Sequence, residues 1–280
     1  MVERCVGRVL ELWRYPVKSM LGEQTKELNV TGQGATGDRA WALRELASGR
    51  IASAKKFPRL LEFRASYDVE PSVDSRGKAK IETPQGQVVW TDDPDTSAVI
   101  SNILGCPMRL ESQPGSHEKT GIDRATVFGD VPVEKFKPEW TPETIPDYFQ
   151  LMGGSFFEIG PVFLATSGSV QHLRDLQGGG AHIDRRRFRP NIYIDSGPDS
   201  SGFAEDAWLG GTLAIGGQVR FSDFQPTIWC VTSTLAQEDL PRDPGILRAI
   251  AEHHRGCFGV YAAVSSPGLV RIDDPLVLSK

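Results

Sequence analysis

Cysteine is scarce in this chain and never closely paired. The 280 residues include four cysteines, which are Cys5, Cys106, Cys230 and Cys257. Since no two of them form a Cys-x-x-Cys pair, the spacing argues against a zinc knuckle, an iron–sulfur cluster and a dithiol redox motif. A disulfide framework is not expected in a chain of this length without a secretory signal.

Long apolar runs and excess basic charge are absent as well. No stretch of about 18 apolar residues occurs, so no membrane partner is expected. Residues 1–7 have neither the basic segment nor the apolar stretch of a signal peptide, which predicts a cytoplasmic protein. The formal net charge is −5, and no region is strongly basic, so no nucleic-acid partner is expected.

Short strand patterns dominate what the chain does contain. The first half has strand candidates at residues 6–17, 40–43 and 60–65 and a hairpin at residues 78–90. The second half has strand candidates at residues 161–165, 191–195, 213–215, 219–221, 258–264 and 269–278. Helices are expected at residues 95–104, at residues 168–176 and after Asp243-Pro244. The pattern predicts a mostly β, β-barrel-like fold with a few short helices.

A segment of linker composition separates two halves of the chain. Residues 111–121 read Glu-Ser-Gln-Pro-Gly-Ser-His-Glu-Lys-Thr-Gly. We therefore expect one domain at residues 1–115 and another at residues 120–280. Residues 132–146 carry four prolines, which indicates irregular loop.

Cys230 is the most informative single residue. It follows a strand-like run that begins at Phe224 and precedes a hydroxyl-rich turn. A thiol there can be a nucleophile, a soft-metal ligand or core filler, and a lone buried cysteine is most often core filler. A Cys–His hydrolase would pair it with His253 or His254, but no orienting residue or signature supports that interpretation.

Basic residues recur beside the expected strands. Lys18-Ser19 follows the first strand and suits a phosphate, although an exposed loop lysine is the simpler interpretation. Arg39 follows an aspartate at a strand entry, where it forms either an anion-binding fork or a structural ion pair. Arg189 abuts a proline and an apolar strand, so it is expected to point inward and to need an anionic or hydrogen-bonding partner.

Together these segments resemble the MOSC family (molybdenum cofactor sulfurase C-terminal domain) with its N-terminal β-barrel domain. Among its members, the amidoxime-reducing components and their bacterial relatives are the most similar. The resemblance covers almost the whole chain in family order, and it is carried by residues 15–19, 37–41, 53–60, 188–192, 208–210, 230–232, 258–261 and 267–268.

The resemblance implies a molybdenum cofactor, Mo-molybdopterin, between the two domains. It makes Cys230 the molybdenum ligand and the catalytic residue, in keeping with the softness of a dithiolene-bound metal. The family's cofactor-binding residues map onto Lys18, Ser19, Arg39, Arg189, Asn191 and Tyr261.

The resemblance also implies a reaction and its partners. The reaction is the two-electron reduction of an N–O bond in a small N-hydroxylated compound, such as an amidoxime, a hydroxylamine or a hydroxylated base analogue. Because no cysteine cluster follows Tyr261, the electrons would come from a separate protein, a flavoprotein reductase or a ferredoxin. Pyridoxal phosphate binding is a further property attached to the family.

Two positions depart from the family pattern and leave alternatives open. Relatives often place arginine directly before the ligand cysteine, where this chain has Ile228-Trp229, and Asp273 replaces a glycine. Trp229 can stack on an aromatic substrate. A second hypothesis is a MOSC-fold carrier of the cofactor or of a sulfur group, or a pathway enzyme that uses Cys230 directly, without N-reduction. A third hypothesis is a binding module with an empty site, but it does not explain why the chain has both the cations and the thiol.

Overall fold

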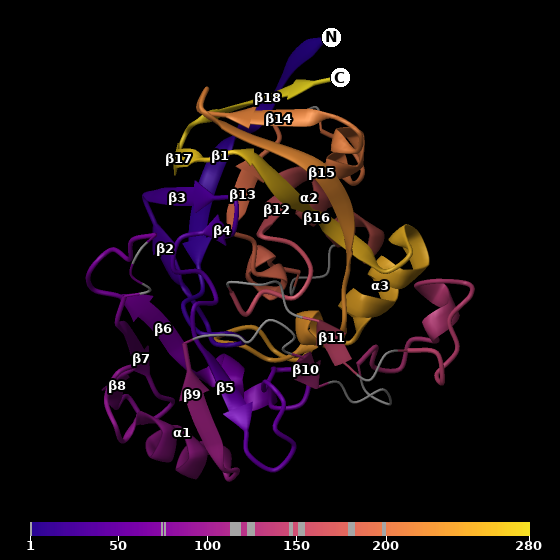
Figure 1. Cartoon of the computed structure of the whole chain (residues 1–280). Helices are drawn as coiled ribbons and strands as arrows, with labels where there is room; N and C mark the ends of the chain where they lie inside the picture. Colours follow the sequence, from indigo (N-terminus) through magenta and orange to yellow (C-terminus); the bar gives the residue numbers. More distant parts are fainter. Residues whose placement is uncertain are drawn as a thin grey trace.

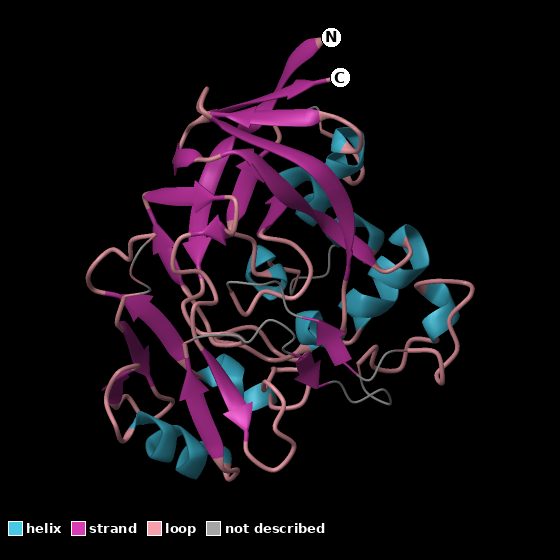
Figure 2. Ribbon diagram, in the orientation of Figure 1, coloured by secondary structure: helices cyan, strands magenta, loops and turns pink. Residues whose placement is uncertain are grey.

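Strands dominate the structure (Figure 2). It is a computed structural model and describes residues 2–73, 75, 77–112, 119–121, 127–145, 148–150, 155–178, 183–197 and 200–280. Within these ranges there are eighteen strands, three α-helices and five short 3-10 helices. The predicted fold class, mostly β with a few short helices, is confirmed. No helix in the described ranges is both long and apolar enough to cross a membrane.

Seven strands close into a barrel (Figure 1). Its order is β13-β12-β16-β15-β14-β18-β1, and a pairing of β13 with β1 completes the ring. The strands are β1 (Glu3–Arg14), β12 (Val162–Thr166), β13 (Ile192–Asp195), β14 (Thr212–Ile215), β15 (Val219–Ile228), β16 (Cys257–Ser266) and β18 (Pro275–Ser279). All pairs are antiparallel except β12 with β13, which the helix α2 (Ser167–Leu176) connects. Such a parallel pair requires a crossover of this kind.

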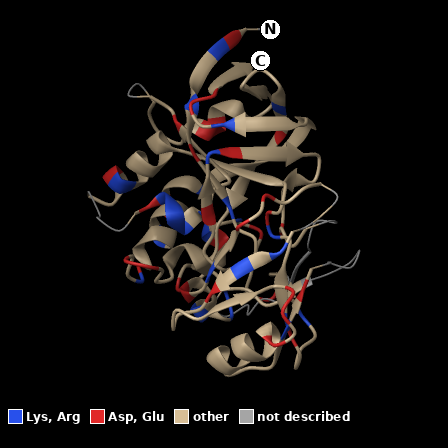
Figure 3. Ribbon diagram, turned by 90° about the vertical axis from the view of Figure 1, so that its left-hand side faces the viewer, with Lys and Arg blue, Asp and Glu red and all other residues tan. Residues whose placement is uncertain are grey.

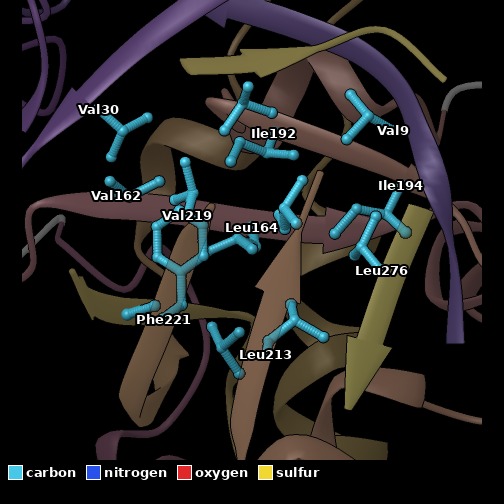
Figure 4. Packing of buried hydrophobic residues seen from close by; sticks show 14 of the residues in the cluster. Val9, Val30, Val162, Leu164, Ile192, Ile194, Leu213, Val219, Phe221 and Leu276 are labelled. Carbon is cyan, nitrogen blue, oxygen red and sulfur yellow. The ribbon is translucent and has the colours of Figure 1, made fainter. Parts of the chain in front are cut away.

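Inward-facing apolar side chains fill the barrel (Figure 4). Leu164, Ile192 and Phe221 lie in the centre of this cluster and are fully buried. Because successive side chains of a strand point to opposite faces, each strand supplies every second residue to the core. Burial of each such side chain stabilises the fold by about 1.5–3 kcal/mol.

The other strands form small sheets. One contains β3 (Glu27–Thr31), β4 (Gly34–Ala35) and β17 (Gly268–Arg271), and another contains β6 (Arg64–Tyr67), β7 (Ala79–Glu82) and β8 (Val88–Trp90). The two-stranded sheets pair β5 (Ala42–Glu45) with β9 (Met108–Glu111) and β10 (Lys119–Gly121) with β11 (Tyr148–Gln150). A last strand, β2 (Glu23–Thr25), extends the barrel sheet beside β1.

The N-terminal strands are shared between the two halves of the chain. β1 pairs with β13 and β18, and β3 pairs with β17, so hydrogen bonds join the first 35 residues to the C-terminal half. The division into residues 1–115 and 120–280 stays a prediction, and residues 113–118 of the expected linker lie outside the described residues.

All three expected helices are present, and they are α1 (Thr96–Leu104), α2 and α3 (Gly245–His254). α1 ends at Gly105, which adopts the left-handed conformation with φ 67°. α3 follows Asp243, whose Oδ1 accepts a hydrogen bond of 2.9 Å from the backbone N–H of Gly245.

Two strand expectations are wrong in extent. Residues 58–62 form a 3-10 helix, η1 (Pro58–Glu62), because Pro58 favours a helical first turn, and the strand β6 begins only at Arg64. Residues 269–278 form two strands rather than one, with a turn at Asp273, whose φ is 66°.

Gly259 holds β16 close to β12 and gives a test of barrel packing. Its φ is +66°, and an added Cβ would lie 2.5 Å from Phe163 Cζ and 2.7 Å from Leu164 O. We expect Gly259→Ala to lower the free energy of unfolding by about 3 kcal/mol, through backbone strain and overpacking. In the matched control Gly86→Ala the φ is +77° with nothing within 4 Å of the added Cβ, so only about 1 kcal/mol should be lost. Urea denaturation measures both values, and equal losses would contradict the packing argument.

Candidate functional site

One pocket collects residues from both halves of the chain. It is a cavity of ≈ 290 Å³. Six of the seven residues singled out from the sequence line it, and these are Lys18, Ser19, Arg39, Arg189, Cys230 and Tyr261. Basic and acidic residues are interspersed over the ribbon rather than gathered on separate faces (Figure 3). The charge that a ligand meets is therefore set locally by this lining.

Cys230 is positioned by the end of a barrel strand. β15 ends at Ile228, and Cys230 is extended, with φ −127°, before the 3-10 helix η5 (Val231–Thr234) begins. The backbone N–H and hydroxyl of Ser233 donate to the Cys230 carbonyl at 3.2 and 3.1 Å. The thiol itself lies 3.4 Å from Thr232 Oγ1. The backbone is thus fixed on both sides of the sulfur, which lines the pocket.

Among the described residues, no histidine pairs with Cys230. His254 lies 2.8 Å from the Cys257 carbonyl through Nδ1 and 2.8 Å from Asp206 Oδ2 through Nε2. No histidine is among the described residues that line the pocket around Cys230. The hydrolase interpretation therefore has no support.

Glu158 joins two buried lysines inside the pocket. Its Oε1 lies 3.0 Å from Lys18 Nζ and 2.7 Å from Lys55 Nζ, and its Oε2 lies 2.6 Å from Lys55 Nζ. Lys18 Nζ also donates to the Phe156 carbonyl at 3.0 Å. Burial raises the pKa of Glu158, but the two ammonium groups outweigh it and hold that pKa at about 2. Burial lowers the pKa of Lys18 to about 8 against the opposing attraction of Glu158.

Arg39 and Arg189 lie against the same tyrosine ring. Their guanidinium carbons are 4.3 and 4.2 Å from the centroid of Tyr15. Arg39 forms an ion pair with Asp38, and Arg189 Nη2 donates to the Met20 carbonyl at 2.7 Å. Burial, and then the charge of Arg39, lowers the pKa of Arg189 to about 10. Among the described residues, Asp38 pairs with Arg39 and no carboxylate pairs with Arg189, an arrangement that favours an added anion.

The pocket fits an anionic group rich in hydrogen-bonding atoms. Among the described residues, three buried polar atoms of the lining have no partner, and these are Arg189 Nη1, Ser53 Oγ and Thr227 Oγ1. Buried polar atoms are rarely left unpaired, and a ligand with hydrogen-bonding groups would pair with these three. Arginine and lysine beside them suit the phosphate and the ring heteroatoms of a pterin, and the Cys230 thiol suits a soft metal. The residues present therefore fit the cofactor that the sequence implied.

Asn191 and Ser19 have structural contacts of their own. The fully buried Asn191 accepts a hydrogen bond from the Phe163 N–H at 3.1 Å and donates to the Trp13 carbonyl at 3.3 Å. It therefore ties β12 to β1 behind the pocket, and its cofactor contact stays a prediction. Ser19 Oγ accepts from the Ala54 N–H at 3.0 Å, which leaves its own proton available to a ligand.

The sequence missed several residues of the pocket. The turn that contains Lys55 looks like solvated surface, yet its side chain is 7% exposed. Burial lowers the pKa of Lys55, but Glu158 and then Cys230 raise it more, so Lys55 lies within electrostatic reach of the sulfur. Glu158 carried no motif, Trp140 belongs to the proline-rich residues 132–146 that indicated only loop, and Phe128 precedes that segment. None of these residues has a local signal, because tertiary packing brings them to the pocket.

Two family models match the chain. Residues 6–101 match the MOSC N-terminal beta barrel domain, and residues 155–277 match the MOSC domain. The chain belongs to the MOSC family. Mitochondrial amidoxime-reducing component 1 of Homo sapiens is 24% identical to this MOSC protein over 98% of the chain and 83% of its own length. The Mus musculus protein of that name is 23% identical over 98% of the chain and 82% of its own length.

A solved structure is also similar. The YUAD protein from Bacillus subtilis matches this MOSC protein with a TM-score of 0.49 and 12% identity, covering 100% of this chain and 98% of that one.

Glu158→Gln tests the charge balance of the pocket. At neutral pH the variant should be less stable by about 3 kcal/mol, because two buried ammonium groups lose their shared carboxylate. The folded-state pKa is depressed from 4.5 to about 2, so this deficit is complete above pH 4.5 and shrinks as the pH falls toward 2. Urea denaturation at neutral pH and in acid measures the deficit. Glu62→Gln, which removes an exposed pair with Arg59, is the control and should cost about 0.5 kcal/mol or less.

Proposed function

We propose that this MOSC protein is a molybdenum-cofactor-dependent oxidoreductase that reduces the N–O bond of small N-hydroxylated compounds. One observation carries the proposal. The thiol of Cys230 shares a pocket with buried cations whose hydrogen-bonding capacity, at Arg189 Nη1, is unfilled among the described residues. The names of the relatives, which are amidoxime-reducing components, support the choice of substrate class.

In this proposal, six of the lining residues hold the cofactor. Lys18, Ser19 and Arg39 would bind the phosphate of the pterin, and Arg189 and Tyr261 would hydrogen-bond its ring system. Cys230 would ligate molybdenum as thiolate. The bound cofactor supplies a soft redox centre that exchanges two electrons and accepts oxygen.

The chain itself supplies orientation, water exclusion and protons. Reduction of R–NHOH consumes two electrons and two protons and yields R–NH2 and water. The ammonium of Lys18 is buried and has a pKa of about 8, so it holds a proton at Nζ near neutral pH that it can share with Glu158. Phe156, Phe157 and Tyr261 cover this end of the pocket with apolar surface. Burial, and then the charge of Glu158, raises the pKa of Tyr261, so its hydroxyl remains a hydrogen-bond donor.

The electrons in this proposal come from a separate flavoprotein reductase or ferredoxin. A cytoplasmic location stays a prediction from residues 1–7, and the relatives named above are mitochondrial proteins. Pyridoxal phosphate binding likewise stays a prediction.

A second candidate function follows from the position before the cysteine. Trp229 stands where relatives often have arginine, and this substitution favours a carrier of the cofactor or of a sulfur group, or direct thiol chemistry at Cys230. The two candidates differ in whether bound metal supports N–O reduction.

Metal content tests the ligand assignment. Protein produced with a supply of cofactor should contain near-stoichiometric molybdenum, and Cys230→Ala should lose most of it together with reductase activity. The control Cys257→Ala removes a thiol that lies outside the pocket and whose pKa burial, and then the charge of Asp206, raises to about 11. Elemental analysis gives the readout. Metal-free wild-type protein would sink the molybdoenzyme proposal, and metal without N–O reduction would favour the carrier.

Arg189 tests the anion-binding end. Arg189→Gln should weaken cofactor retention about tenfold or more, because a charge-assisted hydrogen bond is lost. Arg189→Lys keeps the charge but not the planar fork and should retain an intermediate amount. The measurement is molybdenum content after gel filtration, with thermal denaturation to verify folding. Arg59→Gln, on the surface, is the control, and unchanged retention in Arg189→Gln would contradict the assignment.

A further inference from the structure

Residues 127–145 cover the open side of Cys230 with aromatic rings. The backbone N–H of Val231 donates to the Val127 carbonyl at 2.7 Å, which fastens this segment one residue from the cysteine. Phe128 then packs on Phe136 at 4.3 Å and on Trp140 at 5.8 Å between ring centroids. We call these three rings the aromatic wall.

The aromatic wall is held from behind by helix α3. Leu247 and Ala251 of α3 belong to the same apolar cluster as Phe128 and Phe136. At Gly256 the contact is so close that an added Cβ would lie 2.0 Å from Phe136 Cδ1. Because the wall packs on a helix at this density, its rings form a fixed surface.

The opposite side of this space is also apolar. Ile228, Trp229 and Cys230 pack against the apolar cluster that contains Phe128 and Phe136. The Nε1–H of Trp229 donates to the Phe258 carbonyl at 2.8 Å, so the indole offers the pocket only its ring. Edge contacts with Phe163 and Phe188, at 5.6 and 5.1 Å, hold that ring in place. A substrate beside Cys230 therefore lies between two aromatic surfaces.

Charge around this space selects against cations. Lys137 lines the pocket with its Nζ 4.9 Å from the Trp140 ring centroid, and Lys55 lies deeper in the same pocket. An N-hydroxylated amidine is neutral near pH 7, because oxygen on nitrogen lowers its basicity, whereas the reduced amidine is a cation. The positive lining therefore favours the neutral substrate over the cationic product.

We infer that the substrate is an uncharged N-hydroxylated compound with an aromatic ring, and that Phe128, Trp140 and Trp229 bind that ring beside Cys230. The reacting group rests on the proposed function, whereas the preference for a ring rests on the aromatic surfaces. Contact of one aromatic ring with another changes an affinity by about two- to tenfold, in addition to the effect of buried area. The preference should therefore be measurable with a single substitution.

The test compares benzamidoxime with acetamidoxime, which carries the same reacting group without a ring. In the molybdenum-loaded protein with a chemical reductant, Trp140→Leu should raise the KM for benzamidoxime about tenfold and leave that for acetamidoxime within about twofold. Trp140→Phe keeps a ring and should restore most of the difference. Trp90→Leu is the matched control. Trp90 lies on β8, outside this pocket, and its ring also has a lysine nearby, since Lys78 Nζ is 4.7 Å from the ring centroid.

The outcomes separate the two proposals. Equal KM values for both compounds in the wild type, or proportional changes for both in Trp140→Leu, would overturn the ring preference while leaving N–O reduction intact. If the loaded wild type reduces neither compound, the proposed function fails, and calorimetric binding of the two compounds decides the inference. Ring-dependent binding that Trp140→Leu loses and Trp140→Phe retains would support it. Equal binding of both compounds, or none, would overturn it.

Discussion

The carboxylate of Glu158 is the contact on which the rest of the pocket depends. Lys18 and Lys55 come from the N-terminal half of the chain, and Glu158 lies in the segment before the barrel strand β12. Isolated buried ammonium groups would cost several kcal/mol each, so the two lysines remain charged inside only because a carboxylate lies between them. This ion triad therefore joins the two halves and sets the potential in which any ligand binds.

The barrel supplies the fixed frame around that triad. Cys230 follows the end of β15, Tyr261 lies on the neighbouring strand β16, and Arg189 precedes β13, which β12 separates from β16, so one side of the barrel brings all three to the pocket. Gln225 of β15 pairs with Tyr261, which sets the register between the strand that leads to the cysteine and the strand that carries the tyrosine. A slip of one residue would turn every side chain of a strand to the other face. The closed sheet thus fixes side chains that the loops alone would not orient.

Local sequence predicts those parts of the site that have a local signature. Cys230 ends an alternating strand and Arg189 abuts a proline before a buried strand, so both could be placed from the chain alone. Lys55 and Glu158 could not be placed from the sequence, because each is buried together with a partner that is distant in sequence. Residues 60–65 misled for the opposite reason: Leu60 and Leu61 are buried as in a strand, but they belong to a 3-10 helix. The pattern of apolar residues therefore identifies which residues are in the core more reliably than it identifies the type of secondary structure.

Trp229, the tryptophan before Cys230, is consistent with the distribution of charge in the pocket. An arginine there would join a pocket in which, within the described part of the chain, Glu158 and Asp38 are the carboxylates paired with Lys18, Lys55 and Arg39, and like charges in a buried site repel one another. Trp229 satisfies its single donor on the Phe258 carbonyl and needs no counter-ion. Positive charge still reaches the cysteine through Lys55, which lines the same pocket and comes from across the fold rather than from an adjacent position in sequence. The pocket is thereby divided into a cationic interior suited to the phosphate of a cofactor and an apolar side beside the sulfur. Since the two ends recognise different groups, a substitution on the aromatic side can change which substrate binds without changing what the cations hold.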